Sequence, residues 1–348
     1  MGVDIREVLK ELCETPGPSG FEEAVVLQAK KLIEPYVDEA WVDVLGNLIG
    51  VRKCGRPDAK KLLIDAHIDE IGFVVTGIEE GFLKFAALGG LDVRLLPAAG
   101  VTIMGETAID GVVCVLPPHI LRPEDTEKVT KIDDLYIDVG LSQEEAERRI
   151  PIGTAGVLAS TIRDFGENAI CGKALDNRAG FTAVLSALEQ IQNVNLSVDL
   201  YVMASVEEEV GLRGAGPGVF AISPDHCIVI DVGEARTPDA TDYEIPEKMG
   251  GGVIIARGPN MNRAFTDMVI GLAERSGISH QITVIPGGSS GTNAKEIQIS
   301  QCGVKTALMT IPVKYIHSAN EVVLIDDIES TAKLLVETIK AMKGGVEK

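Results

Sequence analysis

Four strand-length apolar runs in this chain end in, or lead directly to, a residue able to bind a metal ion. KLLIDAH ends at His67, DLYVMASV leads to three glutamates that finish at Glu209, HCIVI precedes Asp231, and ALMTIPVKYI precedes His317. Such short continuous runs are typical of strands buried on both faces of a parallel sheet. In open α/β sheets, ligands collect beyond the carboxyl ends of the strands, where the loops diverge. The sequence therefore predicts that these side chains meet at one edge of a sheet.

The pattern along the chain predicts two domains. Helical periodicity alternates with apolar runs up to residue 70 and again from residue 162 onward, which is typical of a sheet with helices on both faces. Between them, short β-branched runs are broken by Gly and Pro, and only LSQEEAERRI has a helical pattern. We expect a catalytic α/β domain made of residues 1–70 and 162–348, interrupted by an inserted all-β domain at 71–161.

Local signals near the N-terminus predict specific elements. The Pro and Gly residues at 16–20 stop an opening helix, and Ser19 is placed to cap a second helix that begins at Phe21 and runs toward Ile33. The segment AWVDVLGNLIGVRK alternates like a hairpin around Gly46 and Asn47.

Charge and cysteine content exclude several classes of partner and compartment. The net charge of −20 makes phosphate backbones and anionic membranes poor partners. Six cysteines without a C-x-x-C pair are typical of free thiols in a reducing compartment. No apolar run approaches the roughly 18 residues of a membrane span, and the opening residues resemble an amphipathic helix rather than a secretory signal. We therefore expect a cytoplasmic protein that binds neither nucleic acid nor membrane.

The ligand types predict a pair of divalent ions. Two imidazoles and three carboxylates supply the nitrogen and oxygen donors of a two-metal hydrolase site, and one carboxylate can bridge ions roughly 3.5–4 Å apart. Asp176, in the loop GKALDN, is the expected bridge. One ion would then be bound by His67 and Asp231, and the other by Glu209 and His317.

Two further carboxylates have expected catalytic roles. Asp69, two residues after His67, can accept the second imidazole N–H and fix the tautomer. Glu208, beside Glu209, is the expected general base, and Glu207 is the least favoured of the three glutamates.

Structural roles compete with these interpretations. Asp176 could cap a helix, Asp231 could be a turn residue, and the glutamate run could be a solvated surface. The remaining residues of interest are expected to be structural, namely His119, His226, His280, Arg178 and Arg213.

The motifs H-x-D-E-x-G, A-L-D-N-R, E-E-V-G-L-R-G-A, Asp231 and Y-I-H-S stand in the order found in the M42 metallo-aminopeptidases, which the chain resembles over essentially its whole length. The resemblance implies a phosphorylase/hydrolase-like three-layer catalytic domain, a PDZ-like inserted domain used for dimerisation, and often a tetrahedral dodecamer. It also implies two zinc or cobalt ions, with manganese possible. By matching motif, the five residues above resemble the ligands and Glu208 resembles the base. Asn293 stands where many relatives have Asp.

The leading hypothesis is a dinuclear aminopeptidase that hydrolyses N-terminal residues of peptides by a metal-bridging hydroxide, with Glu208 as base. Some M42 relatives are glutamyl or deblocking aminopeptidases and some are labelled endoglucanases. A glycoside hydrolase with paired carboxylates is thus one alternative, although aromatic residues are only 4% and Trp41 is the sole tryptophan. A metal-dependent aminoacylase or deacetylase is another, and an assembly protein is a further one.

Overall fold

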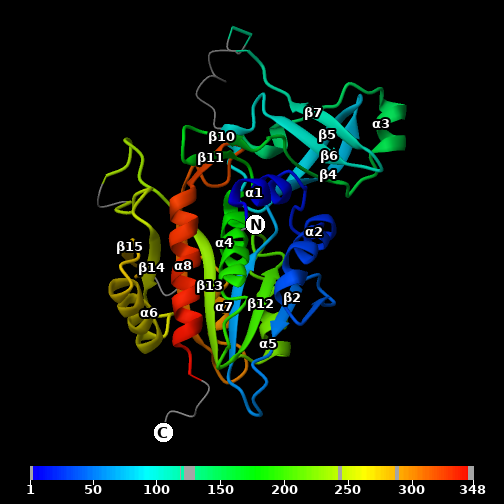
Figure 1. Ribbon diagram of the computed structural model, residues 1–348. Coiled ribbons are helices and arrows are strands. Elements are labelled where there is room, and N and C mark those ends of the chain that lie inside the picture. The colour runs from blue at the N-terminus through cyan, green and yellow to red at the C-terminus, as the bar shows by residue number, and fades with distance from the viewer. Residues whose placement is uncertain (1–2, 118, 121–129, 242–244, 287–289, 344–348) are drawn as a thin grey trace.

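The computed structural model describes all residues except 1–2, 118, 121–129, 242–244, 287–289 and 344–348. The described chain forms a mixed α/β body with a smaller β structure beside it (Figure 1). None of the six cysteines is in a disulfide. Among the described residues, no helix is both long enough and apolar enough to cross a bilayer.

Within the described residues, the larger body is built on one 11-stranded sheet. Its four central strands are parallel and lie in the order β12, β3, β13 and β16. The strands of the sheet are β1 (Glu39–Val42), β2 (Leu48–Arg52), β12 (Asp199–Ser205), β3 (Lys61–His67), β13 (His226–Glu234), β16 (Lys305–Lys314), β17 (Glu321–Leu324), β11 (Ala169–Gly172), β10 (Arg163–Asp164), β14 (Val253–Arg257) and β15 (His280–Val284). Because the central strands run in one direction, their carboxyl ends share one edge of the sheet.

Alternate side chains of the central strands enter two cores on opposite faces of the sheet. In β3, Leu62 and Ile64 belong to one core and Leu63 to the other. Helices α4 and α8 cover the first face, in front of the strands in Figure 1. That face also receives α1, α2 and α6, and the second face receives α5 and α7. The helices are α1 (Ile5–Cys13), α2 (Glu23–Ile33), α4 (Leu175–Gln190), α5 (Ala215–Ile222), α6 (Arg263–Arg275), α7 (Ala294–Ile297) and α8 (Ile325–Ala341).

The N-terminal predictions were partly right. The hairpin forms as β1 and β2, joined through Gly46 and Asn47. The second helix begins at Glu23 and has no side-chain cap. The prediction that Ser19 caps it is wrong, because the Ser19 hydroxyl donates instead to Asp69 Oδ2 at 2.7 Å.

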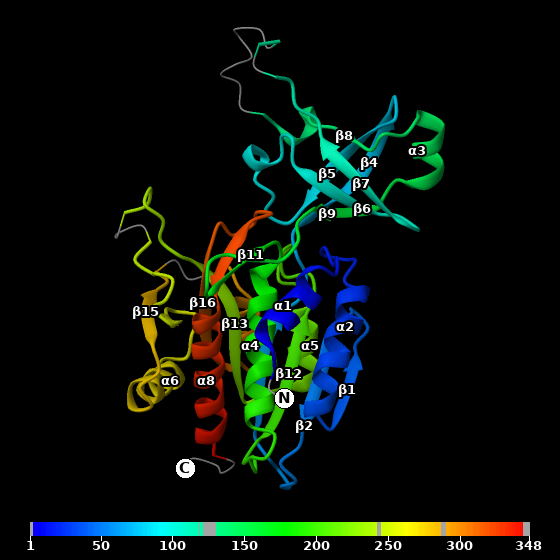
Figure 2. The same cartoon turned by 45° about the horizontal axis from the view of Figure 1, so that its top comes forward.

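The smaller body is a closed barrel in the strand order β4-β5-β8-β7-β6-β9 (Figure 2). It has its own apolar core, in which the rings of Phe73 and Phe85 meet edge to face with centroids 5.4 Å apart. The LSQEEAERRI pattern forms the helix α3, capped by Ser142 and Glu145. The elements are β4 (Gly72–Glu79), β5 (Phe82–Leu88), β6 (Gly100–Met104), β7 (Ala108–Val113), β8 (Ile137–Asp138), α3 (Gln143–Arg149) and β9 (Ala155–Leu158).

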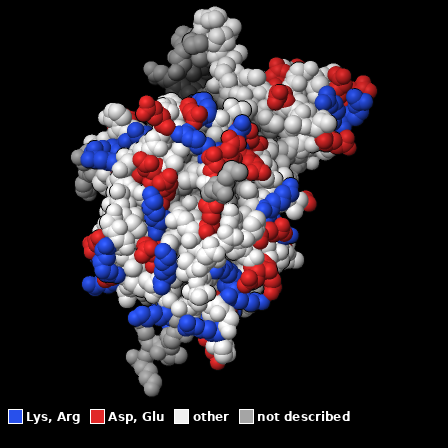
Figure 3. Space-filling model, viewed as in Figure 1, with Lys and Arg blue, Asp and Glu red and all other residues white. Residues whose placement is uncertain are grey.

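Charges of both signs are interspersed on the face shown in Figure 3. Outside the grey residues, Lys and Arg on this face form no continuous basic surface.

Arg178 belongs to the framework, as the sequence predicted. Its side chain is fully buried and donates to the carbonyl oxygen of Thr15 (2.6 Å) and to the Glu70 carboxylate (3.1 Å). Lys173 donates to both oxygens of the same carboxylate, at 2.8 and 2.7 Å. This buried group ties the start of α4 to the N-terminal segment and to the loop after β3.

We predict that Arg178→Ala costs about 3–5 kcal/mol, because it leaves buried polar partners uncompensated. The thermal unfolding midpoint should fall clearly in calorimetry. Arg148→Ala, on the exposed side of α3, is the control and should change stability by at most about 0.5 kcal/mol. Equal midpoints for the two variants would contradict the framework role.

Candidate metal centre

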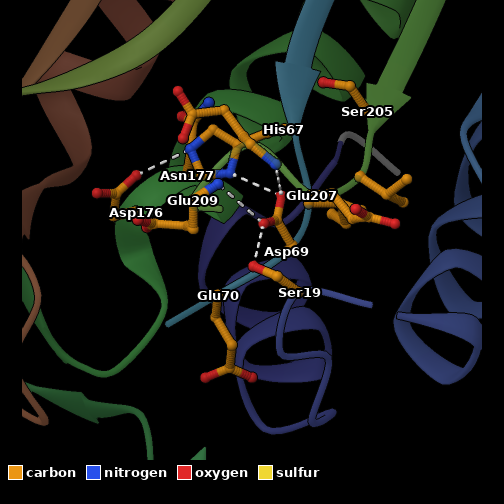
Figure 4. A network of polar contacts seen from close by, with 12 residues as sticks. Ser19, His67, Asp69, Glu70, Asp176, Asn177, Ser205, Glu207 and Glu209 are labelled. Carbon is orange, nitrogen blue, oxygen red and sulfur yellow. Dashed lines mark hydrogen bonds and ion pairs between the residues drawn. The ribbon is translucent and has the colours of Figure 1, made fainter. Parts of the chain in front are cut away.

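The edge formed by the carboxyl ends of the central strands gathers the predicted ligands. His67 is the last residue of β3, Glu209 follows β12, and His317 follows β16. Asp231 was predicted to end its strand, but β13 continues to Glu234 because it stays paired with β16 as far as Val313. Figure 4 shows His67, Asp176 and Glu209 converging from separate elements.

Asp176 lies between the two imidazoles. Its Oδ1 is 3.1 Å from His67 Nε2, and its Oδ2 is 3.4 Å from His317 Nε2. The side chain comes from the start of α4 and is buried. Each carboxylate oxygen therefore faces a different histidine, which is the arrangement that a bridging ligand requires.

Each imidazole also faces a second carboxylate. His67 Nε2 is 3.5 Å from Asp231 Oδ1, and His317 Nε2 is 3.1 Å from Glu209 Oε2. Donors at about 2.0–2.1 Å from a tetrahedral ion lie roughly 3.3–3.4 Å from one another. The observed separations are thus compatible with two sets of ligands, each set around one ion. Asp176 belongs to both sets.

Glu208 lies beside one of these groups. Ligand atoms of His67, Glu208 and Asp231 lie within 4.8 Å of one another, as do those of His67, Asp176 and Glu209. Glu208 is buried, whereas Glu207 turns aside and pairs with the exposed Arg213 at 3.4 Å. The acidic run is therefore only partly a surface feature.

The cluster holds more buried acidic groups than imidazoles. Five buried carboxylates face two imidazoles: Asp69, Asp176, Glu208, Glu209 and Asp231. Burial raises the pKa of Glu208 to about 9 and also raises the pKa of Glu209 and Asp231. Hydrogen bonds to Asp176 and Glu209 raise the pKa of His317 to about 11. Such a site is short of positive charge, and divalent cations would supply it.

Asp69 organises the backbone beside His67. Its Oδ1 lies 3.3 Å from His67 Nδ1, although that nitrogen is not aligned for a hydrogen bond. The Asp69 carboxylate also accepts from the backbone N–H of Glu208 (3.1 Å) and Glu209 (3.2 Å), and from the Ser19 hydroxyl (Figure 4). One side chain thus fixes the positions of both glutamates.

Glu321 is a site residue that the sequence interpretation missed. It is buried, and its two oxygens accept from the backbone N–H of Asp176 (3.0 Å) and of His317 (2.9 Å). His317 itself has a positive φ of 63°. The only feature of the sequence that could have indicated this role is the acidic side chain of Glu321, four positions after the predicted ligand His317.

Asn293 supports the strand that carries His67. Its Nδ2 donates to Asp65 Oδ2 and to Ser205 Oγ, both at 2.9 Å. Burial raises the pKa of Asp65 to about 6, although the hydrogen bonds of its carboxylate with Ser205 and Asn293 act to lower it. An Asp at position 293 would bring a second carboxylate to Asp65, whereas the amide donates to it.

The remaining histidines lie outside the cluster, as expected. His226 stacks edge to face on Phe265, His280 Nδ1 is 2.9 Å from the carbonyl oxygen of Ile278, and His119 is exposed. Two cavities of several hundred Å³ also lie away from the cluster. One of about 520 Å³ includes Lys60 and Lys305 at the opposite ends of the strands, and one of about 720 Å³ lies beside Phe82 of the barrel.

Comparison with known proteins gives a consistent result. The sequence model of the M42 glutamyl aminopeptidase family matches residues 46–334. The chain is 35% identical to the lysyl aminopeptidase of Pyrococcus furiosus over 346 residues, which are 97% of this chain and 98% of that protein. A TET aminopeptidase from a marine sediment Thaumarchaeota archaeon superposes with a TM-score of 0.92 at 33% identity, covering 97% of this chain and 96% of that one.

Two further structures bear on assembly and naming. The Pyrococcus horikoshii TET1 peptidase, which can assemble into a tetrahedron or a large octahedral shell, has a TM-score of 0.85 at 30% identity, with 97% and 100% coverage. A Thermotoga maritima protein named endoglucanase has a TM-score of 0.76 at 28% identity, with 97% coverage of both chains.

These matches define the class of the protein as a hydrolase that acts on peptides. The chain belongs to the M42 glutamyl aminopeptidase family, which is metal-dependent. The resemblance seen in the motifs is thereby confirmed, including the existence of relatives labelled endoglucanase.

We predict that Glu321→Gln weakens divalent-ion binding. The amide offers only one acceptor oxygen, so one of the two backbone N–H groups at Asp176 and His317 would face another donor. The dissociation constant should rise about 10–100-fold, as for other residues that orient ligands. Competition with a chromophoric chelator measures it, with Glu144→Gln on the exposed side of α3 as control. Unchanged affinity would show that Glu321 does not position the ligands.

Proposed function

We propose that this protein is a dinuclear metal-dependent aminopeptidase that hydrolyses N-terminal residues from peptides. The observation that carries the proposal is the Asp176 carboxylate, which presents one oxygen to His67 and the other to His317 within a buried, strongly acidic cluster. The family match supports a peptide substrate.

In this proposal His67 and Asp231 would hold one ion, Glu209 and His317 would hold the other, and Asp176 would be shared between them. Zinc or cobalt fits the nitrogen and oxygen donors best, and manganese is compatible with them. When bound, such a pair lowers the pKa of a water molecule and polarises the scissile carbonyl.

Glu208 is the proposed general base. Its buried carboxylate lies next to the His67 and Asp231 group, where it can take a proton from the attacking water and return it to the leaving amine. Asp69 is proposed to keep the imidazole of His67 oriented, since its carboxylate faces Nδ1.

The alternatives use the same fold differently. An aminoacylase or deacetylase would keep the ions and exchange the peptide for a small amide, so substrate assays separate it from the leading proposal. An endoglucanase would need a surface on which sugars stack, but Trp41 lies on the edge strand β1, which is separated from β3 by β2 and β12. Apart from the name of one relative, no observation on this protein supports an endoglucanase.

We also propose a domain organisation and an assembly. The separate core of the barrel supports an inserted domain at 71–161 within a catalytic domain of 1–70 and 162–348. We interpret the catalytic part as a phosphorylase/hydrolase-like three-layer structure and the barrel as a PDZ-like dimerisation module. The assemblies of the TET relatives support a homo-oligomer, from a dimer to a tetrahedral dodecamer. A cytoplasmic location fits the free thiols.

Glu208→Gln should retain both ions but lose turnover by about 10²–10⁴-fold, because the amide cannot accept a proton. His317→Ala should instead lose an ion, because it removes the imidazole that faces Glu209 and Asp176. Elemental analysis of purified protein together with kcat separates the two effects. Full turnover by Glu208→Gln would remove Glu208 from its proposed role.

Stripping the protein with EDTA should abolish hydrolysis of aminoacyl p-nitroanilides, and adding back zinc, cobalt or manganese should restore it. The same protein should not cleave a soluble cellulose derivative with or without metal. Cellulose cleavage that is insensitive to EDTA would support the glycosidase instead, since that chemistry needs only paired carboxylates.

A further inference from the structure

A cavity of about 520 Å³ lies at the amino ends of the central strands, opposite the candidate metal centre. Lys60 immediately precedes β3, His226 begins β13 and Lys305 begins β16, and all three line the cavity. The distance along β3 from Lys60 to His67 is roughly 23 Å, at a rise of about 3.3 Å per residue. A ligand in this cavity would therefore not reach the ligand cluster at the other end of the strands.

The side chains at the strand starts point to the same face of the sheet. His226 is in register with Leu62 of β3 and with Lys305 of β16. Lys60 is two residues before Leu62, and alternate residues of a strand share a face. Leu62 belongs to the core that α6 and α8 cover, so both lysines point toward these helices. Because only β13 separates β3 from β16, the two lysine backbones lie roughly 10–12 Å apart. Their long side chains can approach one ligand.

Helix α6 supplies most of the apolar wall of the cavity. Phe265, Met268 and Leu272 line it at spacings of three and four residues, so they lie on one side of the helix. Met342, which follows α8, adds to this wall. The ring of Phe265 also meets that of His226 edge to face, with centroids 5.0 Å apart, which joins the wall to the strand ends. The volume is within the roughly 300–1,000 Å³ of sites for small molecules.

The charge of the lining is opposite to that of the whole protein. The chain has 52 acidic and 32 basic residues. No described Asp or Glu lines the cavity, whereas four cationic residues do: Lys60, Arg275, Lys305 and Lys343. None of the four forms an ion pair with another described residue. The Arg275 side chain lies back against Gly271, so its guanidinium is directed along α6 toward the start of the helix. Such a lining suits an anion.

We propose that this cavity binds a small organic phosphate with an apolar or aromatic body. A phosphate ester carries about −1.5 to −2 charges at pH 7 and three strong acceptor oxygens, so it can contact cations from several elements at once. A carboxylate carries a single charge and would leave more of the cations unmatched. Lys60 and Lys305 face the phosphate, and the apolar side of α6 packs against the body of the ligand. The proposal does not depend on the peptide hydrolysis proposed above.

The test is isothermal titration calorimetry of the metal-loaded protein with 1-naphthyl phosphate, 1-naphthoate and inorganic phosphate. The naphthoate keeps the aromatic body but has one charge, and inorganic phosphate keeps the charge but lacks the body. The dissociation constant of 1-naphthyl phosphate should be about tenfold or more below that of either. The double variant Lys60→Gln/Lys305→Gln should raise it about tenfold or more. The control Lys10→Gln/Lys31→Gln, at exposed positions of α1 and α2, should leave it unchanged.

Each contrary outcome overturns a stated part of the proposal. Equal affinity for 1-naphthoate and 1-naphthyl phosphate would overturn the choice of a phosphate. Binding that survives the Lys60 and Lys305 substitutions but disappears after EDTA treatment would place the phosphate at the metal centre instead of in the cavity. No detectable binding of 1-naphthyl phosphate would overturn the proposal altogether. An unchanged rate of hydrolysis of aminoacyl p-nitroanilides by the double variant would support a site that is separate from the proposed catalytic one.

Discussion

The structure depends on one buried carboxylate that is placed between two histidines. Asp176 contacts His67 through one oxygen and His317 through the other, although the three residues are brought together from distant parts of the chain. Around it lie four more buried acidic groups, whose ionised forms would repel one another. Concentrated buried charge of one sign is costly unless cations compensate it. The cluster therefore favours divalent ions, which the proposed peptidase chemistry would use.

Besides the contacts between the predicted ligands, the surrounding fold holds this cluster by hydrogen bonds to backbone groups. Asp69 accepts from the amides of Glu208 and Glu209, and Glu321 accepts from those of Asp176 and His317. Asp69 thus fixes the segment that follows β12, and Glu321 joins the start of α4 to the segment that follows β16. Ligand orientation is thus set by the same contacts that join the strand ends, so changes at Asp69 or Glu321 should affect the site without removing a ligand.

Much of the site could be predicted from the sequence because burial on both faces makes the central strands continuous apolar runs. Those runs place His67 and His317 at strand ends, and parallel strands share that edge. The roles of Ser19 and Glu321 could not be read in the same way. Ser19 is 50 residues from Asp69, and Glu321 is 145 residues from Asp176, so neither contact has a local pattern.

The end of β13 was misplaced for a related reason. Pairing with β16 extends the strand past Asp231, and pairing between strands is a property of the folded sheet. Interpretation of the sequence was thus reliable where burial alone decides the pattern and failed where partners distant in sequence decide it.

The most direct test of the account is anomalous X-ray diffraction from crystals of zinc-loaded protein at the zinc absorption edge. The account predicts two peaks per chain, one beside His67 and Asp231 and one beside Glu209 and His317, with an Asp176 oxygen directed at each. A single peak, or two peaks that Asp176 does not contact, would contradict it.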